Sequence, residues 1–399
     1  MASFRSRLAA VVVLVLTACG PAPSGTTSAT TITSTSPAAG NPGRLFVIVE
    51  GKTRCYGSPC TVAIVDRDGR VRARRTFNQP PPAMIGCEGG WIYSSVQVAG
   101  NAAYYLDDSG LVRRLSASGA VTEVAHFPIR TSQQVVWYGV SPDGRKLMAA
   151  IMVYTPLSPS WNPQQGCPIH EQGRTYEEVD LATAGGSTTT LSDQTNPPQV
   201  MSVVGWDRTG PVAVPDSHMA YIGFIEGTVW GGPAVHLDLH GHPVGGVIGG
   251  ANCTALFGEN TGGNLVCHDR KQPTVRNSAG TMLWALKALD SADDFSYGAI
   301  ALSPDASHVA FSLNRQFAFD SSVIRSRDGV RIGLGSSFQP QGWLDDQTVI
   351  GARGSVQVTC SGCQPDFVPT TLGIINLARP TEVRDLGISG TFLGALQGE

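Results

Sequence analysis

The first 43 residues contain only two charged side chains, Arg5 and Arg7, and the apolar run that follows them is short. Leu8 to Leu16 is continuously apolar, whereas a membrane-spanning helix needs about 20 apolar residues. This lack of apolar length argues against a transmembrane anchor. A basic start followed by a short apolar run and small residues is instead typical of an export signal.

The remainder of the chain lacks basic clusters, phosphate-binding loops and helical patterning. The formal net charge is −3, which argues against nucleic acid as a partner. The glycine-rich stretches GGPAV and GGVIGG have neither the lysine nor the strand–loop–helix context of a phosphate loop. We therefore predict no nucleotide and no other cofactor. Without a convincing amphipathic helix, the sequence predicts an all-β fold.

Leu16-Thr17-Ala18-Cys19 follows the apolar run and resembles the bacterial lipobox. The resemblance implies that residues 1–18 are a signal peptide and that Cys19 becomes a lipidated N-terminus carrying acyl chains such as palmitate. Two acyl chains suffice for stable anchoring where one does not. The expected location is the bacterial cell membrane, on its extracytoplasmic side. The alternative is an ordinary signal peptide with an incidental cysteine.

The segment after Cys19 has the composition of a tether. From Gly20 to Gly43 it is rich in Ser, Thr, Pro, Ala and Gly and has no charged residue, so it cannot bury enough apolar surface to fold. A flexible coil of this length typically spans ~27 Å. We predict a lipidated tether over residues 19–43 and a folded region over residues 44–399.

Cysteine usage also indicates an oxidising compartment, because eight cysteines remain when Cys19 is set aside. Spacing pairs six of them, and elimination pairs the other two: Cys55 with Cys60, Cys253 with Cys267, Cys360 with Cys363, and Cys87 with Cys167. The Cys-x-x-Cys pair at 360–363 also has the spacing of a redox site. A redox-active pair usually opens a helix, whereas this one follows a predicted strand over 355–359, which favours a structural disulfide.

Two kinds of repeat organise the folded region. One is an apolar strand, a Ser-Pro-Asp turn and a second apolar strand, found in YGVSPDGRKLMAAIM from Tyr138 and IALSPDASHVAFSL from Ile300. Only Ser141 to Gly144 has the full Ser-Pro-Asp-Gly sequence, since Ala306 replaces the final glycine in the second copy. The other repeat is a hairpin with a polar turn of the Asp-x-x-Gly kind, which recurs seven times when looser copies are included.

Seven such units of short strands predict a β-propeller of four-stranded blades. The Ser-Pro-Asp turn before an apolar strand resembles the repeat of TolB-type and WD-repeat-like propellers of bacterial envelope proteins. We expect seven blades, with six or eight as alternatives. The N-terminal unit is short of strands, and the segment TFLGAL at 391–396 could supply the missing strand and close the ring.

Candidate metal ligands and catalytic groups are few. His236, Asp238 and His240 would share one face of a strand and could bind zinc, but the same stretch fits a hairpin whose turn uses Asp238 and Gly241. Neighbouring acid pairs could serve a glycosidase only if they met in three dimensions; they are Asp107-Asp108, Glu177-Glu178, Asp293-Asp294 and Asp345-Asp346. We assign no catalytic residue and favour a protein that is not an enzyme.

A long insertion between strands, from Met152 to Tyr176, carries Tyr154 and Trp161. Loops on a rigid scaffold often form binding sites, and Trp and Tyr favour interfaces, so Tyr154, Trp161 and Tyr176 are predicted binding residues. The alternative is an insertion packed on the propeller. The function we expect is a protein-binding scaffold at the cell envelope. The alternative function is a propeller enzyme or ligand-binding protein that acts on glycans or small molecules.

Overall fold

The structure is a computed structural model, and its described residues belong to the second of two units, residues 42–399. They are residues 44–51, 59–81, 83–85, 90–92, 96–154, 174–195, 200–216, 228–229, 234–251, 253, 255–257, 263–268, 273–287, 300–315, 318–357 and 366–397. Every regular element within these ranges is a β-strand. None of the described residues belongs to a helix long and apolar enough to cross a membrane.

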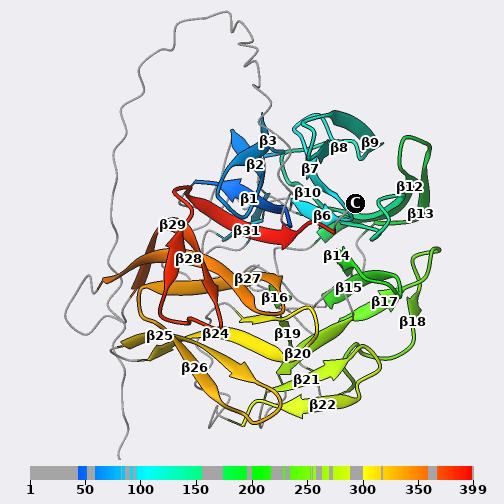
Figure 1. The fold of residues 1–399 in the computed structure, drawn as a ribbon. Helices are drawn as coiled ribbons and strands as arrows, with labels where there is room; N and C mark the ends of the chain where they lie inside the picture. The colour runs from blue at the N-terminus through cyan, green and yellow to red at the C-terminus, as the bar shows by residue number, and fades with distance from the viewer. Residues whose placement is uncertain are drawn as a thin grey trace, which may run out of the picture. The chain divides into compact units, whose positions relative to one another are not determined.

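Seven antiparallel sheets succeed one another along the chain and form a β-propeller (Figure 1). The first three blades each contain four strands. Blade one contains β31 (Gly390–Ala395), β1 (Phe46–Glu50), β2 (Cys60–Val65) and β3 (Val71–Phe77). Blade two contains β6 (Gln97–Ala99), β7 (Ala102–Leu106), β8 (Leu111–Ser116) and β9 (Val121–His126). Blade three contains β10 (Gln134–Val140), β11 (Lys146–Tyr154), β12 (Arg174–Thr183) and β13 (Thr188–Thr195).

The remaining four blades follow the same order, except that the fifth has one additional strand, β16, which lies in the sequence between two strands of the fourth. Blade four contains β14 (Val200–Trp206), β15 (Pro211–Asp216), β17 (Val235–Leu237) and β18 (Pro243–Val244). Blade five contains β16 (Thr228–Val229), β19 (Ala255–Phe257), β20 (Asn264–His268), β21 (Thr274–Asn277) and β22 (Met282–Ala285). Blade six contains β23 (Ile300–Leu302), β24 (His308–Arg315), β25 (Ala318–Arg325) and β26 (Arg331–Gly335). Blade seven contains β27 (Phe338–Asp345), β28 (Thr348–Gln357), β29 (Asp366–Asn376) and β30 (Val383–Asp385). Outside the blades, β4 (Ala83–Ile85) and β5 (Gly90–Ile92) form a separate two-stranded sheet.

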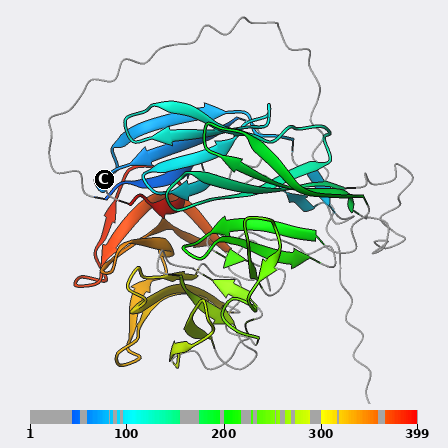
Figure 2. The same cartoon turned by 90° about the vertical axis from the view of Figure 1, so that its right-hand side faces the viewer.

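The two ends of the folded region share the first blade. β31 pairs antiparallel with β1, with Phe46 opposite Ala395 and Ile48 opposite Phe392. The red C-terminal strand accordingly lies beside the blue N-terminal strands in both views (Figure 1, Figure 2). The predicted all-β class, the seven blades and the closing strand near 391–396 are thus confirmed. Closure in this way leaves no gap between the first and last blades.

Seven apolar clusters hold the ring together, one between each pair of successive blades and one between the seventh and the first. β10 illustrates how one strand serves two clusters. Val136 and Tyr138 pack toward the second blade, whereas Val135 and Trp137 pack toward the fourth. Successive side chains of a strand point to opposite faces, so a strand between two blades must be apolar on both faces.

The antiparallel order also places turns at defined ends of each blade. The turn between the first and second strands and the turn between the third and fourth strands lie at one end, which we call the turn face. It includes residues 66–70, 141–145, 303–307, 326–330 and 345–347. Side chains of the first and seventh blades meet there, since Arg67 pairs with Asp345, and Arg384 donates to Asp68 at 2.8 Å.

Candidate functional site

A hollow of about 350 Å³ opens on the turn face between the sixth and seventh blades. Three turns line it: the one between β23 and β24, the one between β25 and β26, and the one between β27 and β28. The lining residues are Ser307, His308, Arg325, Ser326, Arg327 and Gln347. None of these six is acidic, and every one carries a side chain that can donate hydrogen bonds. The lining therefore suits a ligand group that accepts hydrogen bonds and carries negative charge.

The Ser-Pro-Asp turn of the sixth blade fixes one wall of the hollow. The Ser303 hydroxyl donates to Asp305 Oδ1 at 2.7 Å and accepts the backbone N–H of His308 at 2.9 Å. The Ser307 hydroxyl lies 2.6 Å and 2.7 Å from the two carboxylate oxygens of Asp305. Burial would raise the pKa of Asp305, but the Ser307 and Ser303 hydrogen bonds lower it overall. Asp305 thus remains ionised and holds both serines in place.

His308 follows this turn as the first residue of β24 and is almost fully buried. Its ring lies 5.8 Å from the Trp343 ring, and its Nδ1 is 2.7 Å from the Ser307 hydroxyl. The single hydroxyl proton of Ser307 is directed at Asp305, so the geometry fits Nδ1–H of His308 as the donor to Ser307. Burial lowers the pKa of His308, and Arg325 and Arg327 lower it further against the opposing carboxylates. The imidazole is therefore neutral at pH 7.

The adjacent turn, between β25 and β26, presents two arginines that share one carboxylate; His308 pairs with Arg325 in the sheet, and the Ser326 N–H donates to the Ser307 carbonyl at 2.8 Å. Arg325 donates to Asp328 through Nε at 3.0 Å and through a terminal nitrogen at 2.6 Å. Arg327 Nε lies 3.5 Å from Asp328 Oδ2, and the Arg327 side chain is 73% exposed. The hydrogen bond from Arg325 lowers the pKa of Asp328 to about 2. Two cations against one anion leave this turn with a net positive charge, and Arg327 keeps donors directed to solvent.

The predicted binding residues of the 152–176 insertion lie in different environments. Tyr154 is the last residue of β11 and packs in the core between the third and fourth blades, so its assignment to an exposed loop is wrong. Both faces of β11 are apolar, which hides the end of the strand in the sequence. Tyr176 is half-buried on β12, and Trp161 lies outside the described residues.

Tyr176 belongs to a polar cluster between the second and third blades. Arg130 donates to both oxygens of Glu178 at 2.6 Å and 3.2 Å, and the Tyr176 hydroxyl donates to Glu178 at 2.5 Å. Burial raises the pKa of Asp180 to about 6, and the Glu178 carboxylate contributes to the rise. Glu178 and Asp180 are only 4% and 2% exposed. A glycosidase acid must reach its substrate, so this pair is too buried for that role.

The three candidate metal ligands are not gathered on one strand face. β17 ends at Leu237, and Asp238 begins the turn, where its carboxylate accepts the N–H groups of His240 and His242 at 2.8 Å and 2.9 Å. His236 instead lies 2.7 Å from Asp207 Oδ2. Burial would raise the pKa of Asp207, but the His236 hydrogen bond lowers it. Within the described ranges, no group of three or more His, Cys, Asp or Glu could hold a metal ion.

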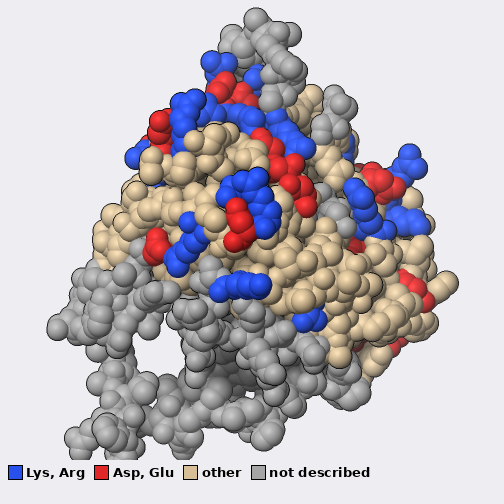
Figure 3. Space-filling model, turned by 60° about the horizontal axis from the view of Figure 1, so that its bottom comes forward, with Lys and Arg blue, Asp and Glu red and all other residues tan. Residues whose placement is uncertain are grey.

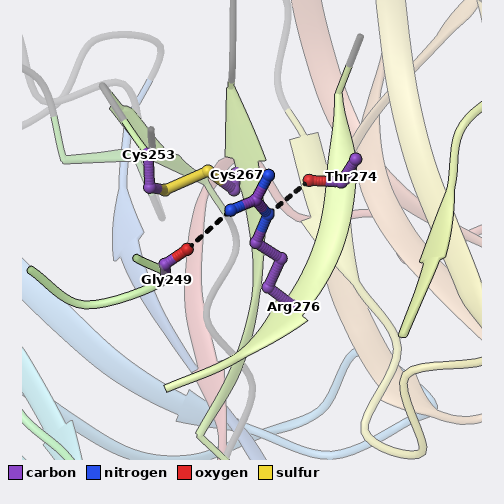
Figure 4. The surroundings of a disulfide bond; sticks show 5 residues. All are labelled: Gly249, Cys253, Cys267, Thr274 and Arg276. Atoms are coloured by element: carbon purple, nitrogen blue, oxygen red, sulfur yellow. Dashed lines mark hydrogen bonds between the residues drawn. A yellow bond between two sulfur atoms is a disulfide. The ribbon is translucent and has the colours of Figure 1, made fainter. Parts of the chain in front are cut away.

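Cys253 and Cys267 form a disulfide with Cα atoms 5.3 Å apart (Figure 4). Arg276 lies beside it and donates to the Gly249 carbonyl at 2.9 Å and to the Thr274 hydroxyl at 2.8 Å. The disulfide joins the segment that precedes β19 of the fifth blade to β20. Cys60 is also disulfide-bonded. The other cysteines of the predicted disulfides lie outside the described residues, as does the predicted lipidation site Cys19: they are Cys55, Cys87, Cys167, Cys360 and Cys363.

Charges of both signs are interspersed over the described surface seen in Figure 3. No extended area of a single sign is visible among the described residues in that view. The repeats predicted each of the three turns that line the hollow, but they did not indicate that Arg325, Arg327 and Gln347 would meet.

No protein-family model matches the sequence, and no curated protein sequence matches it. Solved structures match it at low sequence identity. A puromycin-hydrolyzing peptidase of Mycobacterium tuberculosis is 13% identical, covering 86% of this chain and 54% of its own, with a TM-score of 0.45. The Pyrococcus horikoshii acylaminoacyl peptidase is 10% identical, covering 86% and 50%, with a TM-score of 0.44. TolB from Acinetobacter baumannii is 12% identical, covering 88% and 66%, with a TM-score of 0.32. The chain thus spans about half the length of the peptidases that it matches.

Proposed function

We propose that this protein is a lipid-anchored, extracytoplasmic β-propeller that binds a protein partner at the cell envelope. The apolar run that ends at Cys19 supports the anchor, and the uncharged segment up to Gly43 supports a tether. The disulfide between Cys253 and Cys267 is in keeping with an oxidising compartment. In this scheme the acyl chains set the location, the tether sets the reach, and the propeller presents a recognition surface.

The observation that carries the binding role is the hollow on the turn face. Its walls are held by hydrogen bonds within the Ser303–Asp305 turn and by the Arg325–Asp328 pair. A preformed site binds with a smaller entropic cost than one that must be ordered on binding. The exposed guanidinium of Arg327 also belongs to a residue type that often dominates the binding energy of interfaces.

Site-specific photocrosslinking in cells tests this role. A photoreactive amino acid replaces Gln347, which is exposed at the hollow, or Thr189, which is exposed on β13 of the third blade. We expect one reproducible envelope protein crosslinked from position 347 and not from position 189. Equal capture from both positions, or no capture from a folded and abundant protein, would contradict binding at the hollow.

The anchor has a separate test. Cys19→Ala removes the sulfur that carries the lipid, and we expect the protein to move from the membrane fraction to the soluble exported fraction. Ser24→Ala serves as the control because it changes a residue of the tether and leaves Cys19 and the lipobox intact. Retention of the Cys19→Ala protein in membranes would overturn lipid anchoring.

A further inference from the structure

We propose that the hollow between the sixth and seventh blades binds a carboxylate group of the protein partner, with Arg327 as its principal contact. This inference rests on the proposed binding function and specifies the chemistry of the group that is recognised. The carboxylate would be an acidic side chain or a C-terminus. Its donors are the free nitrogens of Arg327, the remaining nitrogen of Arg325, and the side chains of Ser326 and Gln347.

The distribution of charge around the hollow supports a carboxylate. The acidic residues nearby are not among the lining residues, and each already accepts hydrogen bonds from within the protein. Asp305 accepts the Ser303 and Ser307 hydroxyls, Asp346 accepts the N–H of Asp305 at 2.9 Å, and Asp328 accepts Arg325. A planar guanidinium with unused donors can form two parallel hydrogen bonds with a planar carboxylate. The site therefore resembles one half of an arginine–carboxylate pair whose acid is supplied by a partner.

His308 makes this binding sensitive to pH. The groups that face it are Asp305 from the β23–β24 turn, Arg325 and Arg327 from the end of β25 and the turn after it, and Asp346 from the β27–β28 turn. A bound carboxylate adds negative charge and offsets the two arginines, which raises the pKa of His308. Binding then takes up a proton, so affinity increases as the pH falls through the range between the two pKa values. Each unit of pKa rise strengthens binding by up to about tenfold.

Succinate is a suitable probe, with succinamide as its uncharged counterpart. The full chain carrying Cys19→Ala is titrated at pH 5.5 and pH 7.5, and the His308 ring is followed by NMR, with His308→Gln to assign its signal. We expect succinate to bind more tightly at pH 5.5 and succinamide not to bind. Inorganic phosphate that bound as tightly as succinate would overturn the assignment of a carboxylate.

Arg327→Gln is the decisive variant, because its exposed side chain can be changed without disturbing the core. We expect it to weaken succinate binding about tenfold or more, the loss expected for hydrogen bonds to a charged group. Arg145→Gln is the control, since Arg145 is also an arginine of the turn face, is 84% exposed, and lies in the third blade, away from the hollow. Equal succinate affinity in the wild type and in Arg327→Gln would refute the proposal.

The role of His308 is tested by the pH dependence alone. We expect the ratio of succinate affinities at pH 5.5 and pH 7.5 to be above one in the wild type and to fall to about one in His308→Gln. If this variant does not fold, the test is proton uptake when succinate binds to the wild type. It is measured from the binding heats in two buffers of different ionisation enthalpy, and the absence of proton uptake would contradict the role of His308. If succinate does not bind but position 347 gives a specific crosslink, only the carboxylate assignment is refuted. If succinate does not bind and position 347 gives no specific crosslink, the binding role is refuted as well.

Discussion

The two Ser-Pro-Asp turns, at 141–144 in the third blade and at 303–306 in the sixth, have the same hydrogen bonds in different surroundings. In each turn the serine hydroxyl donates to the aspartate and accepts the backbone N–H five residues after the serine. The two distances are 2.6 Å and 2.9 Å in the third blade, and 2.7 Å and 2.9 Å in the sixth. The three-residue motif therefore determines the local conformation independently of the blade.

The fourth residue of each turn has a positive φ, which is +68° at Gly144 and +59° at Ala306. An aromatic residue of the preceding blade contacts this position in both cases. A Cβ at Gly144 would lie 2.3 Å from the Tyr104 hydroxyl, whereas Trp284 donates to the Ala306 carbonyl at 2.9 Å. The third blade thus requires glycine for space as well as for conformation, and the sixth tolerates a methyl group at the cost of backbone strain.

The fifth and sixth residues differ in chemistry. In the third blade they are Arg145, which is highly exposed, and Lys146 at the start of β11. In the sixth blade they are Ser307 and the buried His308, and both line the hollow. The comparison shows that the motif provides a stable turn, while the residues after it are free to provide a site.

The largest effect we expect is from Gly144→Ala. A positive φ costs a non-glycine residue about 1–2 kcal/mol, and the contact with the Tyr104 hydroxyl adds a cost of overpacking, for a total loss of about 2–4 kcal/mol in the free energy of unfolding. Urea denaturation measures it. Gly119→Ala is the control, because φ is +86° there and a Cβ would meet nothing within 4 Å. Equal losses in the two variants would show that Tyr104 does not make the difference.

Ser141→Ala and Ser303→Ala test whether the two turns are energetically equivalent. Each variant removes one hydroxyl that both donates and accepts, so we expect a loss of about 1–2 kcal/mol in the free energy of unfolding in each blade. Ser118→Ala should change it by less than about 0.5 kcal/mol, because Ser118 is exposed and bonds only the Ser116 hydroxyl. A loss at one turn that is twice the loss at the other would show that the surroundings contribute.

The propeller could be predicted because its signals are local and repeated. Each turn is encoded by a few adjacent residues, and Asp238 and Gly241 form the turn that the hairpin pattern predicts. The closing strand was also predictable, since the N-terminal unit is visibly short of strands. Tyr154 was misassigned because β11 is buried on both faces, so no alternation of polar and apolar residues marks its end.

The hollow could not be predicted in the same way. Its residues come from three repeats, at 307–308, 325–327 and 347, and each set is unremarkable within its own hairpin. The pairing of β24 with β25 brings the first two sets together, and the packing of the sixth blade against the seventh, around Ala301 and Trp343, adds Gln347. Such a site depends on which turns become neighbours, and a single sequence does not contain that information locally.

A smaller effect, on the pH dependence of stability, distinguishes the residues at the sixth position of the two turns, His308 and Lys146. The pKa of His308 is lower in the folded state than in the unfolded state, where it is about 6.5. The folded state then binds fewer protons, so stability is present above pH 6.5 and is lost as the pH falls below it. The carboxylates near His308 oppose the lowering, which keeps the effect modest.

Urea midpoints between pH 4.5 and pH 8 measure this dependence. We expect His308→Gln to flatten the curve below pH 6.5 and Lys146→Gln to leave its shape unchanged. Asp180 contributes the opposite slope, because its pKa of about 6 is raised and stability falls as the pH rises toward that value. Variants are therefore compared with the wild type at each pH, so that the contribution of Asp180 cancels. An identical pH dependence of the urea midpoint in the wild type and in His308→Gln would contradict the role of His308.

The smallest effect we expect is from Ala306→Gly, where two contributions nearly cancel. Relief of the positive φ should stabilise the turn by about 1 kcal/mol. Loss of the buried methyl group, which packs in the cluster between the fifth and sixth blades, should cost about 0.8 kcal/mol. The free energy of unfolding should then change by less than about 0.5 kcal/mol. A stabilisation above 1 kcal/mol would mean that the methyl contributes no packing, and a clear destabilisation would mean that the sixth blade has adapted its core to alanine where the third requires glycine.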